Sequence, residues 1–153
     1  MQVGIIIPAR NEAEALGRVL AEIPRALVRE VIVVDNGSSD RTVELIQREF
    51  PWVRLFSGHG NLMFAGGNNY GFKQATAPLI FMLNPDTVVH PGALRKLAEF
   101  ADAHPEAGMI APRVLNPDGS ELRLYTAPAN VPWANPANIA FDGAHDRILV
   151  TNH

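Results

Sequence analysis

The sequence passes from an apolar run into a polar turn at residues 81–87, FMLNPDT. The run at 79–83 has the length and composition of a buried strand. Ligands of open α/β sheets bind just beyond the carboxyl ends of the strands, so Asp86 would stand where a metal ion or a phosphate-bound cation is held. An ordinary turn is the alternative, because the residue types at 84–87 all favour turns. The rest of the chain favours the first interpretation.

Three more apolar runs are expected to be strands: 3–7, 31–34 and 53–56. Helical spacing of apolar residues follows the first two of these runs, and Ser39 or Asp40 can cap the second helix. A third helix is expected near 68–76, after a segment rich in glycine and asparagine at 58–71. Pro91 opens a fourth helix. A short strand at 109–111 and a hairpin within 114–124 complete the expected elements.

Strands that alternate with helices over residues 3–111 predict an α/β fold, with a mostly parallel sheet covered by helices on both faces. Residues 126–153 differ, because three prolines interrupt the pattern there. We therefore expect one domain, made of the α/β part at residues 1–125 and an irregular, Pro-rich C-terminal segment at 126–153. An exposed edge of the sheet could also drive self-association into a homo-oligomer.

The right-handed crossover rule places the turns that follow residues 7, 34 and 83 along one edge of this sheet. Several carboxylates on one edge are not explained by packing. The turns carry Arg10, Glu12, Asp35, Asp40, Asn84 and Asp86.

Composition excludes several classes of function. The chain has 153 residues, 47% hydrophobic and 19% charged, and a net charge of -3, which gives no electrostatic reason to expect nucleic acid. It has no cysteine, so thiolate metal sites and a cysteine nucleophile are excluded. Apolar runs of about five residues are far shorter than the roughly 20 that span a bilayer, so no transmembrane segment or signal peptide is expected.

The turn at 8–12 contains no glycine, although close approach of the backbone to a dinucleotide pyrophosphate needs one. A nicotinamide or flavin enzyme is therefore not expected. A nucleotide can instead be held by carboxylates: one accepts from a uracil or thymine N–H or from ribose hydroxyls, and another holds a cation. Mg²⁺ and Mn²⁺ commonly use one or two protein carboxylates together with substrate phosphates. Asp35 and Asp86 are the candidates for these two tasks.

Four ordered motifs resemble family 2 glycosyltransferases, which have the Rossmann-like GT-A fold of nucleotide-diphospho-sugar transferases. Residues 5–12, IIIPARNE, resemble the opening motif of that family, and 33–40, VVDNGSSD, resemble its second nucleotide-binding motif. Residues 65–72, AGGNNYGF, and 81–87 are similar to the rhamnosyltransferase-like branch, as are PGAL at 91–94 and PDGS at 117–120.

The resemblance implies a set of donor-binding residues: Pro8, Ala9, Arg10, Glu12, Asp35, Gly67, Asn68 and Asn84. Asp86 matches the last Asp of the family's Asp-x-Asp metal motif, which implies Mg²⁺ or Mn²⁺ as cofactor. Asn84 stands at the first position of that motif and lacks the charge, which should weaken metal binding.

The implied activity is inverting transfer of a sugar, such as rhamnose, from a dTDP- or UDP-sugar to a hydroxyl of a glycan or lipid-linked acceptor. This reaction of polysaccharide biosynthesis would take place in the cytoplasm, or at the inner face of the membrane. It needs a general base, and Asp142 and Asp146 are the remaining candidates, although surface carboxylates are the simpler interpretation.

The family's usual base segment has no match in this sequence, so the chain is expected to hold the donor half of an enzyme truncated at its C-terminus. Two alternatives stay open. One is a non-catalytic or inactive nucleotide-sugar-binding fragment. The other is a nucleotidyltransferase, a class that usually needs a glycine-rich, basic first turn, which residues 8–12 do not supply.

Overall fold

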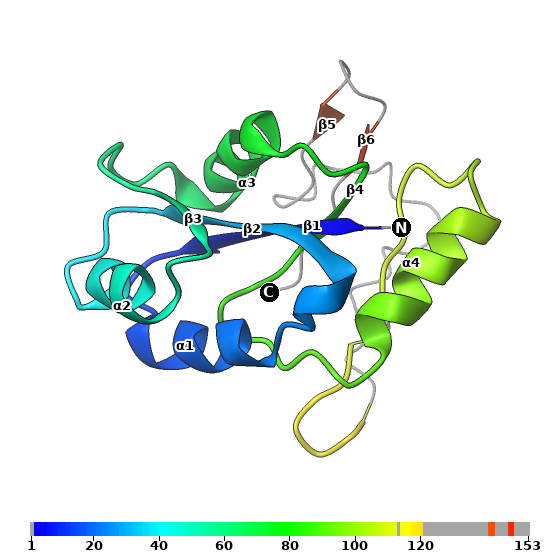
Figure 1. The fold of residues 1–153 in the computed structure, drawn as a ribbon, viewed down its shortest axis with the longest axis horizontal. Coiled ribbons are helices and arrows are strands. Elements are labelled where there is room, and N and C mark those ends of the chain that lie inside the picture. The colour runs from blue at the N-terminus through cyan, green and yellow to red at the C-terminus, as the bar shows by residue number, and fades with distance from the viewer. Residues whose placement is uncertain (1, 113, 121–140, 143–146, 149–153) are drawn as a thin grey trace, which may run out of the picture.

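A computed structural model describes residues 2–112, 114–120, 141–142 and 147–148. Its main sheet has four parallel strands in the order β3-β2-β1-β4, and β5 and β6 form a separate antiparallel pair (Figure 1). The elements in chain order are β1 (Val3–Ala9), α1 (Ala13–Glu22), the 3-10 helix η1 (Arg25–Leu27), β2 (Val28–Asp35), α2 (Thr42–Glu49), β3 (Arg54–Phe56), α3 (Met63–Gln74), β4 (Leu79–Met82), α4 (Ala93–Ala103), β5 (Phe141–Asp142) and β6 (Arg147–Ile148).

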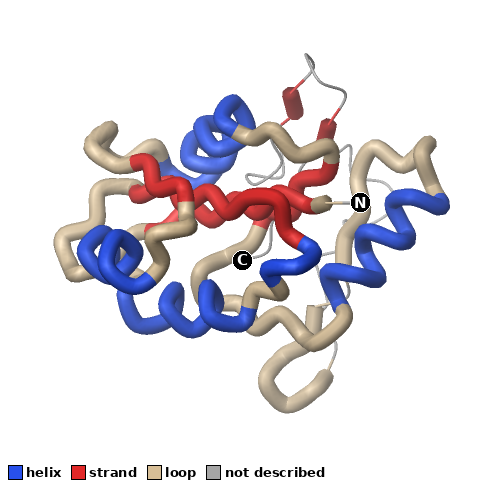
Figure 2. Tube along the Cα trace, viewed as in Figure 1, coloured by secondary structure: helices blue, strands red, loops and turns tan. Residues whose placement is uncertain are grey.

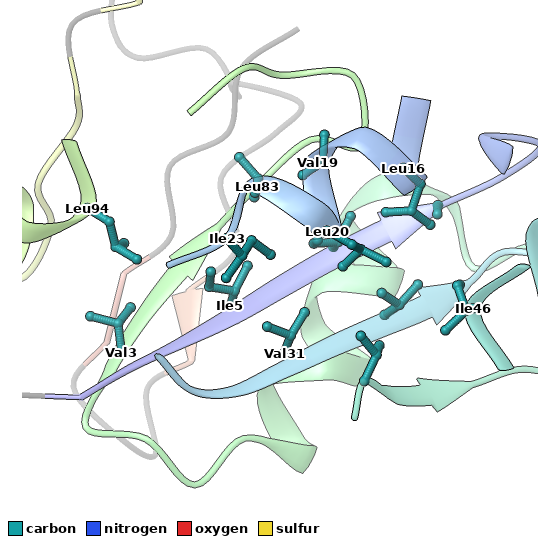
Figure 3. Packing of buried hydrophobic residues seen from close by; sticks show 14 residues of the cluster. Val3, Ile5, Leu16, Val19, Leu20, Ile23, Val31, Ile46, Leu83 and Leu94 are labelled. Carbon is teal, nitrogen blue, oxygen red and sulfur yellow. The ribbon is translucent and has the colours of Figure 1, made fainter. Parts of the chain in front are cut away.

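Helices pack against both faces of the two central strands, β1 and β2. All seven residues of β1 are buried, because it lies between β2 and β4 and under helices on both sides. Side chains alternate between faces along a strand. Ile5 and Val33 join the cluster with α1 and α2, shown in Figure 3, whereas Ile6 and Val34 pack with Phe72 of α3. The expected parallel α/β sheet with helices on both faces is therefore confirmed.

Helix α3 begins at Met63, five residues before the expected start at 68. Glycine and asparagine lower helix propensity, which is why the segment was interpreted as a loop. Close packing outweighs propensity here. A Cβ on Gly71 would lie 2.6 Å from Ile6 Cγ2, and one on Gly67 would lie 3.2 Å from Pro8 Cβ. The glycines let the helix approach β1 at a distance that other residues would prevent.

Two other predictions differ from the structure. Residues 109–111 form no strand and continue the loop after α4 (Figure 2), so that prediction was wrong. An apolar tripeptide is too short to distinguish a strand from a packed loop. Strand β2 begins at Val28, before the expected 31. The expected hairpin is described only up to Ser120, where Asn116 N donates to Ser120 O at 2.8 Å; residues 121–124 lie outside the described residues.

Candidate functional site

Three neighbouring strands, β2, β1 and β4, end at the same edge of the sheet. Ala9 pairs with Asp35 in the last register position of β1 and β2, and Leu83 N donates to Ile6 O at 3.0 Å just after β4. Each strand is followed by a polar turn. The turn after β4 closes with Thr87 N donating to Asn84 O at 3.3 Å. The crossover rule thus predicted the edge correctly.

The turn after β1 is bound to the turn after β2. Asn11 has a φ of +58°, and its backbone N–H donates to Ser38 Oγ at 2.9 Å. Asn11 Oδ1 accepts from Ser39 N at 2.7 Å. Asparagine tolerates this left-handed backbone conformation better than most residues. Asn11 therefore fixes the two turns relative to each other, although only Arg10 and Glu12 beside it were singled out from the sequence.

Thr42, at the start of α2, connects Glu12 to Asp40. Its buried hydroxyl accepts from Glu12 N at 3.0 Å and donates to Asp40 Oδ1 at 2.5 Å, while Thr42 N donates to the same oxygen at 2.9 Å. The carboxylate of Asp40 thus accepts from the first backbone N–H of α2, although the residue at the N-cap position is Arg41. Burial raises the pKa of Asp40, but the hydrogen bonds from Thr42 and from Ala13 N outweigh this and lower it.

Glu12 lies among other carboxylates. Burial raises its pKa above the ordinary 4.5, and the negative charges of Asp86 and Asp40 raise it further. These three residues follow β1, β4 and β2 respectively, the three neighbouring strands that end at this edge. Within the described part of the chain, none of the ion pairs involves Glu12, Asp35, Asp40 or Asp86. The edge therefore gathers negative charge without a protein cation paired to it.

Asp35 and Asn36 lie deeper at this edge, with 3% and 5% of their surfaces exposed. Asp35 Oδ1 accepts from Ser38 N at 3.1 Å, which holds the carboxylate against the turn after β2. Asn36 N donates to Ala9 O at 2.8 Å and continues the ladder between β1 and β2 by one residue. By contrast, Arg10 and Asp86 are exposed, and Asn84 is half-buried.

Helix α3 borders the edge through Gly67, whose Cβ position lies beside Pro8 and the Asn36 amide. Asn68 is 1% exposed, so it lies inside the protein and not open at the edge. Its Nδ2 donates to Phe64 O at 3.0 Å, and Oδ1 has no hydrogen-bond partner within the described residues. The structure therefore brings Pro8, Ala9, Arg10, Glu12, Asp35, Gly67, Asn84 and Asp86 to one edge and places Asn68 behind it.

The described residues contain no group of three or more His, Asp, Glu or Cys side chains that could hold a metal ion by themselves. Mg²⁺ and Mn²⁺ do not need such a group, because one or two carboxylates suffice when substrate phosphates and water supply the other oxygens. Asp86 is an exposed oxygen donor near Glu12 and Asp40. The donor set fits a cation site that a diphosphate completes.

The two candidates for a general base come from the C-terminal part of the sequence. Asp142 lies in β5, where its backbone pairs with Arg147 of β6, and Asp146 lies outside the described residues. No helix among the described residues is long and apolar enough to cross a membrane.

Three residues important for this geometry, Asn11, Asn36 and Thr42, were missed as site residues. Asn36 had a usable signal: Ile32, Val34 and Asn36 alternate toward the face that α3 covers. Asn11 and Thr42 had none, because their partners lie 27 to 30 residues away in the sequence.

A model of the family "Glycosyl transferase family 2" matches residues 4–148. The chain is 32% identical over 118 residues to N-acetylglucosaminyl-diphospho-decaprenol L-rhamnosyltransferase of Mycobacterium tuberculosis, covering 69% of this chain and 38% of that protein. It is 32% identical over 130 residues to succinoglycan biosynthesis protein ExoO of Rhizobium meliloti, covering 81% and 37%. The chain thus spans well under half the length of these curated relatives.

The fold is similar to the crystal structure of S. aureus TarS 1-349, with a TM-score of 0.59, 22% identity, and coverage of 68% of this chain and 33% of that one. Together with the parallel sheet, this likeness confirms the expected GT-A fold. Because the family model covers nearly the whole sequence, the chain belongs to glycosyl transferase family 2.

Proposed function

We propose that this chain is the donor-binding part of an inverting glycosyltransferase. It binds a dTDP- or UDP-sugar at the edge formed by β2, β1 and β4, and the sugar passes to a hydroxyl of a glycan or lipid-linked acceptor. Rhamnose is the first sugar to test, because a relative is named as an L-rhamnosyltransferase acting on a lipid diphosphate. The reaction takes place in the cytoplasm, at the inner face of the membrane where the acceptor is lipid-linked.

One observation carries the proposal: carboxylates follow three adjacent strand ends, and none of them forms an ion pair within the described residues. The electrostatic consequence of this arrangement is a raised pKa of Glu12, caused first by burial and then by the negative charges of Asp86 and Asp40. Like charges held together in a fold are destabilising unless a ligand compensates them. A cation bound with a diphosphate supplies that compensation. A structure of TarS in complex with UDP, which has the same fold at 22% identity, is consistent with this assignment.

Each residue has a proposed task. Asp35, fixed by Ser38 N, accepts hydrogen bonds from the base or the ribose. Arg10, exposed after β1, offers positive charge to the diphosphate. Asp86 holds the divalent cation, with Asn84 beside it in the same turn. When bound, Mg²⁺ or Mn²⁺ would stabilise the negative charge that develops on the leaving diphosphate. Gly67 keeps α3 close to Pro8 and so sets the floor of the site, with Asn68 supporting it from behind.

Calorimetric titration of UDP and dTDP, with and without Mn²⁺, tests the site. We expect Asp86→Ala to abolish the manganese-dependent part of the affinity, because this substitution removes the carboxylate proposed to hold the cation. Asp35→Ala should weaken nucleotide binding even without metal. Asp102→Ala, which removes an exposed carboxylate on α4, is the matched control and should bind as the unmodified chain does. Normal binding by both Asp35 and Asp86 variants would overturn the site assignment.

Catalysis needs a separate measurement. A panel of nucleoside diphosphate sugars is screened first by thermal stabilisation, because a ligand that binds only the folded state raises the melting temperature. The best donor is then assayed for hydrolysis and transfer. Stabilisation without turnover would favour the alternative, a nucleotide-sugar-binding fragment that lacks its general base.

A further inference from the structure

Asn36 uses its side chain to join the end of β2 to the beginning of α3. Its Nδ2 donates to Met63 O at 3.2 Å, and its Oδ1 accepts from Leu62 N at 3.3 Å. Its backbone N–H is bonded to Ala9 O of β1. One buried residue thus connects β1, β2 and α3, and it does so immediately after Asp35.

The segment that Asn36 holds is the glycine loop, residues 58–62. Gly58 and Gly60 have φ angles of +87° and +72°, and a Cβ built on either would meet nothing within 4 Å. The loop passes over the turn after β2, because a Cβ on Gly37 would lie 3.5 Å from the Gly60 carbonyl carbon. Figure 1 shows this loop and the turn after β2 at the same end of the sheet. The loop therefore borders the space beside Asp35.

The glycine loop is held at two points. The His59 ring packs against Tyr70, with 4.8 Å between ring centroids. The second attachment is the Asn36 amide, at the point where the loop becomes helix. Met63, the first residue of α3, has a φ of +60°, which is rare for a residue with a side chain. A strained entry of this kind persists only where surrounding contacts hold it.

An amide suits this position because it must donate to a carbonyl and accept from an N–H at the same time. Gly67 leaves room for it: a Cβ there would lie 3.1 Å from Asn36 Nδ2 and 3.3 Å from Oδ1. Both distances are too short for an unstrained fit, so the Asn36 amide and Gly67 depend on each other.

We propose that Asn36 is a positioning residue: it seats the glycine loop and the first turn of α3 beside Asp35, and so sets the affinity for the nucleotide without contacting it. This inference rests on the proposed nucleotide site. If the contacts are lost, the loop moves about its two open glycines and one wall of that site is no longer fixed.

The test combines hydrogen exchange with calorimetry on Asn36→Ala. Local opening of a segment whose two buried hydrogen bonds are removed should raise amide exchange in residues 58–66 by about tenfold, with smaller changes elsewhere. The UDP or dTDP dissociation constant should rise by a similar factor, about tenfold, since the ordered loop must form on binding. Asn116→Ala, which loses a bond from Nδ2 to Ser120 Oγ in a surface turn, is the matched control and should change neither quantity.

A double-mutant cycle distinguishes the proposed dependence of Asn36 and Gly67 on each other from a general loss of stability. Gly67→Ala alone should also weaken binding and speed exchange in residues 58–66, because its Cβ crowds the amide. In the Asn36→Ala background that crowding is gone, so Gly67→Ala should cost less than it does alone. Additive effects of the two substitutions would contradict the proposed dependence.

The outcomes separate the two proposals. If the unmodified chain binds no nucleotide, the proposed function fails, and the exchange data still decide whether Asn36 holds the loop. If the unmodified chain binds nucleotide and Asn36→Ala binds equally well, the positioning role is wrong while the site survives. Unchanged exchange in residues 58–66 would overturn the inference in either case.

Discussion

The carboxylates near the two ends of strand β2 differ in their hydrogen bonds and ion pairs. At the beginning, Glu30 has a side chain only 7% exposed, and its Oε1 accepts from Thr76 N, Thr76 Oγ1 and Ala77 N. Its other oxygen is paired with Arg54, which also donates to Gln74 O at 2.9 Å. At the far end, the negative charges of Asp86 and Asp40 act on Glu12, and none of the three forms an ion pair among the described residues.

The difference is visible in the direction of the pKa shifts. Burial raises the pKa of Glu30, but the hydrogen bonds from Thr76 and Ala77 and the Arg54 pair outweigh it and lower the pKa below 4.5. Glu12 has its pKa raised, with burial and two negative neighbours acting in the same direction. One end of the strand is therefore satisfied internally and stabilises the fold. The other end leaves charge that a ligand can compensate, which is why we propose the site there.

The largest expected effect comes from breaking the satisfied end. Glu30→Ala removes the acceptor of three hydrogen bonds from Thr76 and Ala77 and one of the two acceptors of Arg54, and should lower the free energy of unfolding by roughly 2–4 kcal/mol. Chemical denaturation measures this change. Glu22→Ala, which removes an exposed carboxylate from α1, should cost far less. Equal losses of unfolding free energy in the two variants would show that the Glu30 network stabilises the fold no more than an exposed carboxylate does.

The Glu30 network could not have been predicted from the sequence. Thr76 and Ala77 lie 46 and 47 residues after Glu30 in the sequence, and no local sequence pattern predicts such a contact. What the sequence predicted well depends on periodicity: the runs that became β1, β2 and β4, and the crossover rule that placed Asp35 and Asp86 on one edge. The start of α3 was missed because its glycines act by close packing against Ile6 and Pro8, which appears only in three dimensions.

The free energy of unfolding should depend on pH differently in the unmodified chain and in the neutral variant Glu30→Gln. A depressed pKa means that the stability from Glu30 is fully present above 4.5, the unfolded value, and is lost as pH falls through the lower folded value. Glu30→Gln should therefore be less stable than the unmodified chain at pH 7, with a gap that narrows as pH falls below 4.5. Urea unfolding at several pH values measures the gap. A gap independent of pH would mean that Glu30 does not titrate with folding.

The third prediction concerns the link between the two turns of the unsatisfied end. Thr42→Val keeps the shape of a buried side chain but removes the hydroxyl that joins Glu12 N to Asp40 Oδ1, and should cost about 1–2 kcal/mol of unfolding free energy. Thr42→Ser keeps the hydroxyl and should recover most of that loss. If the serine variant is no better than valine, packing of the methyl group, and not the hydrogen bonds, holds the turns together.

The smallest expected effect has the opposite sign, because Glu12 destabilises the metal-free fold. Its raised pKa means that stability is fully present below 4.5 and is lost as pH rises through the higher folded value. Glu12→Gln should therefore match the unmodified chain near pH 4 and become more stable at pH 7, by about 0.5 kcal/mol or less, since the group is partly in water. Salt should shrink the gain by screening Asp86 and Asp40. A loss of stability at pH 7 would mean that Glu12 has a compensating partner, and the contrast between the two ends of β2 would then no longer hold.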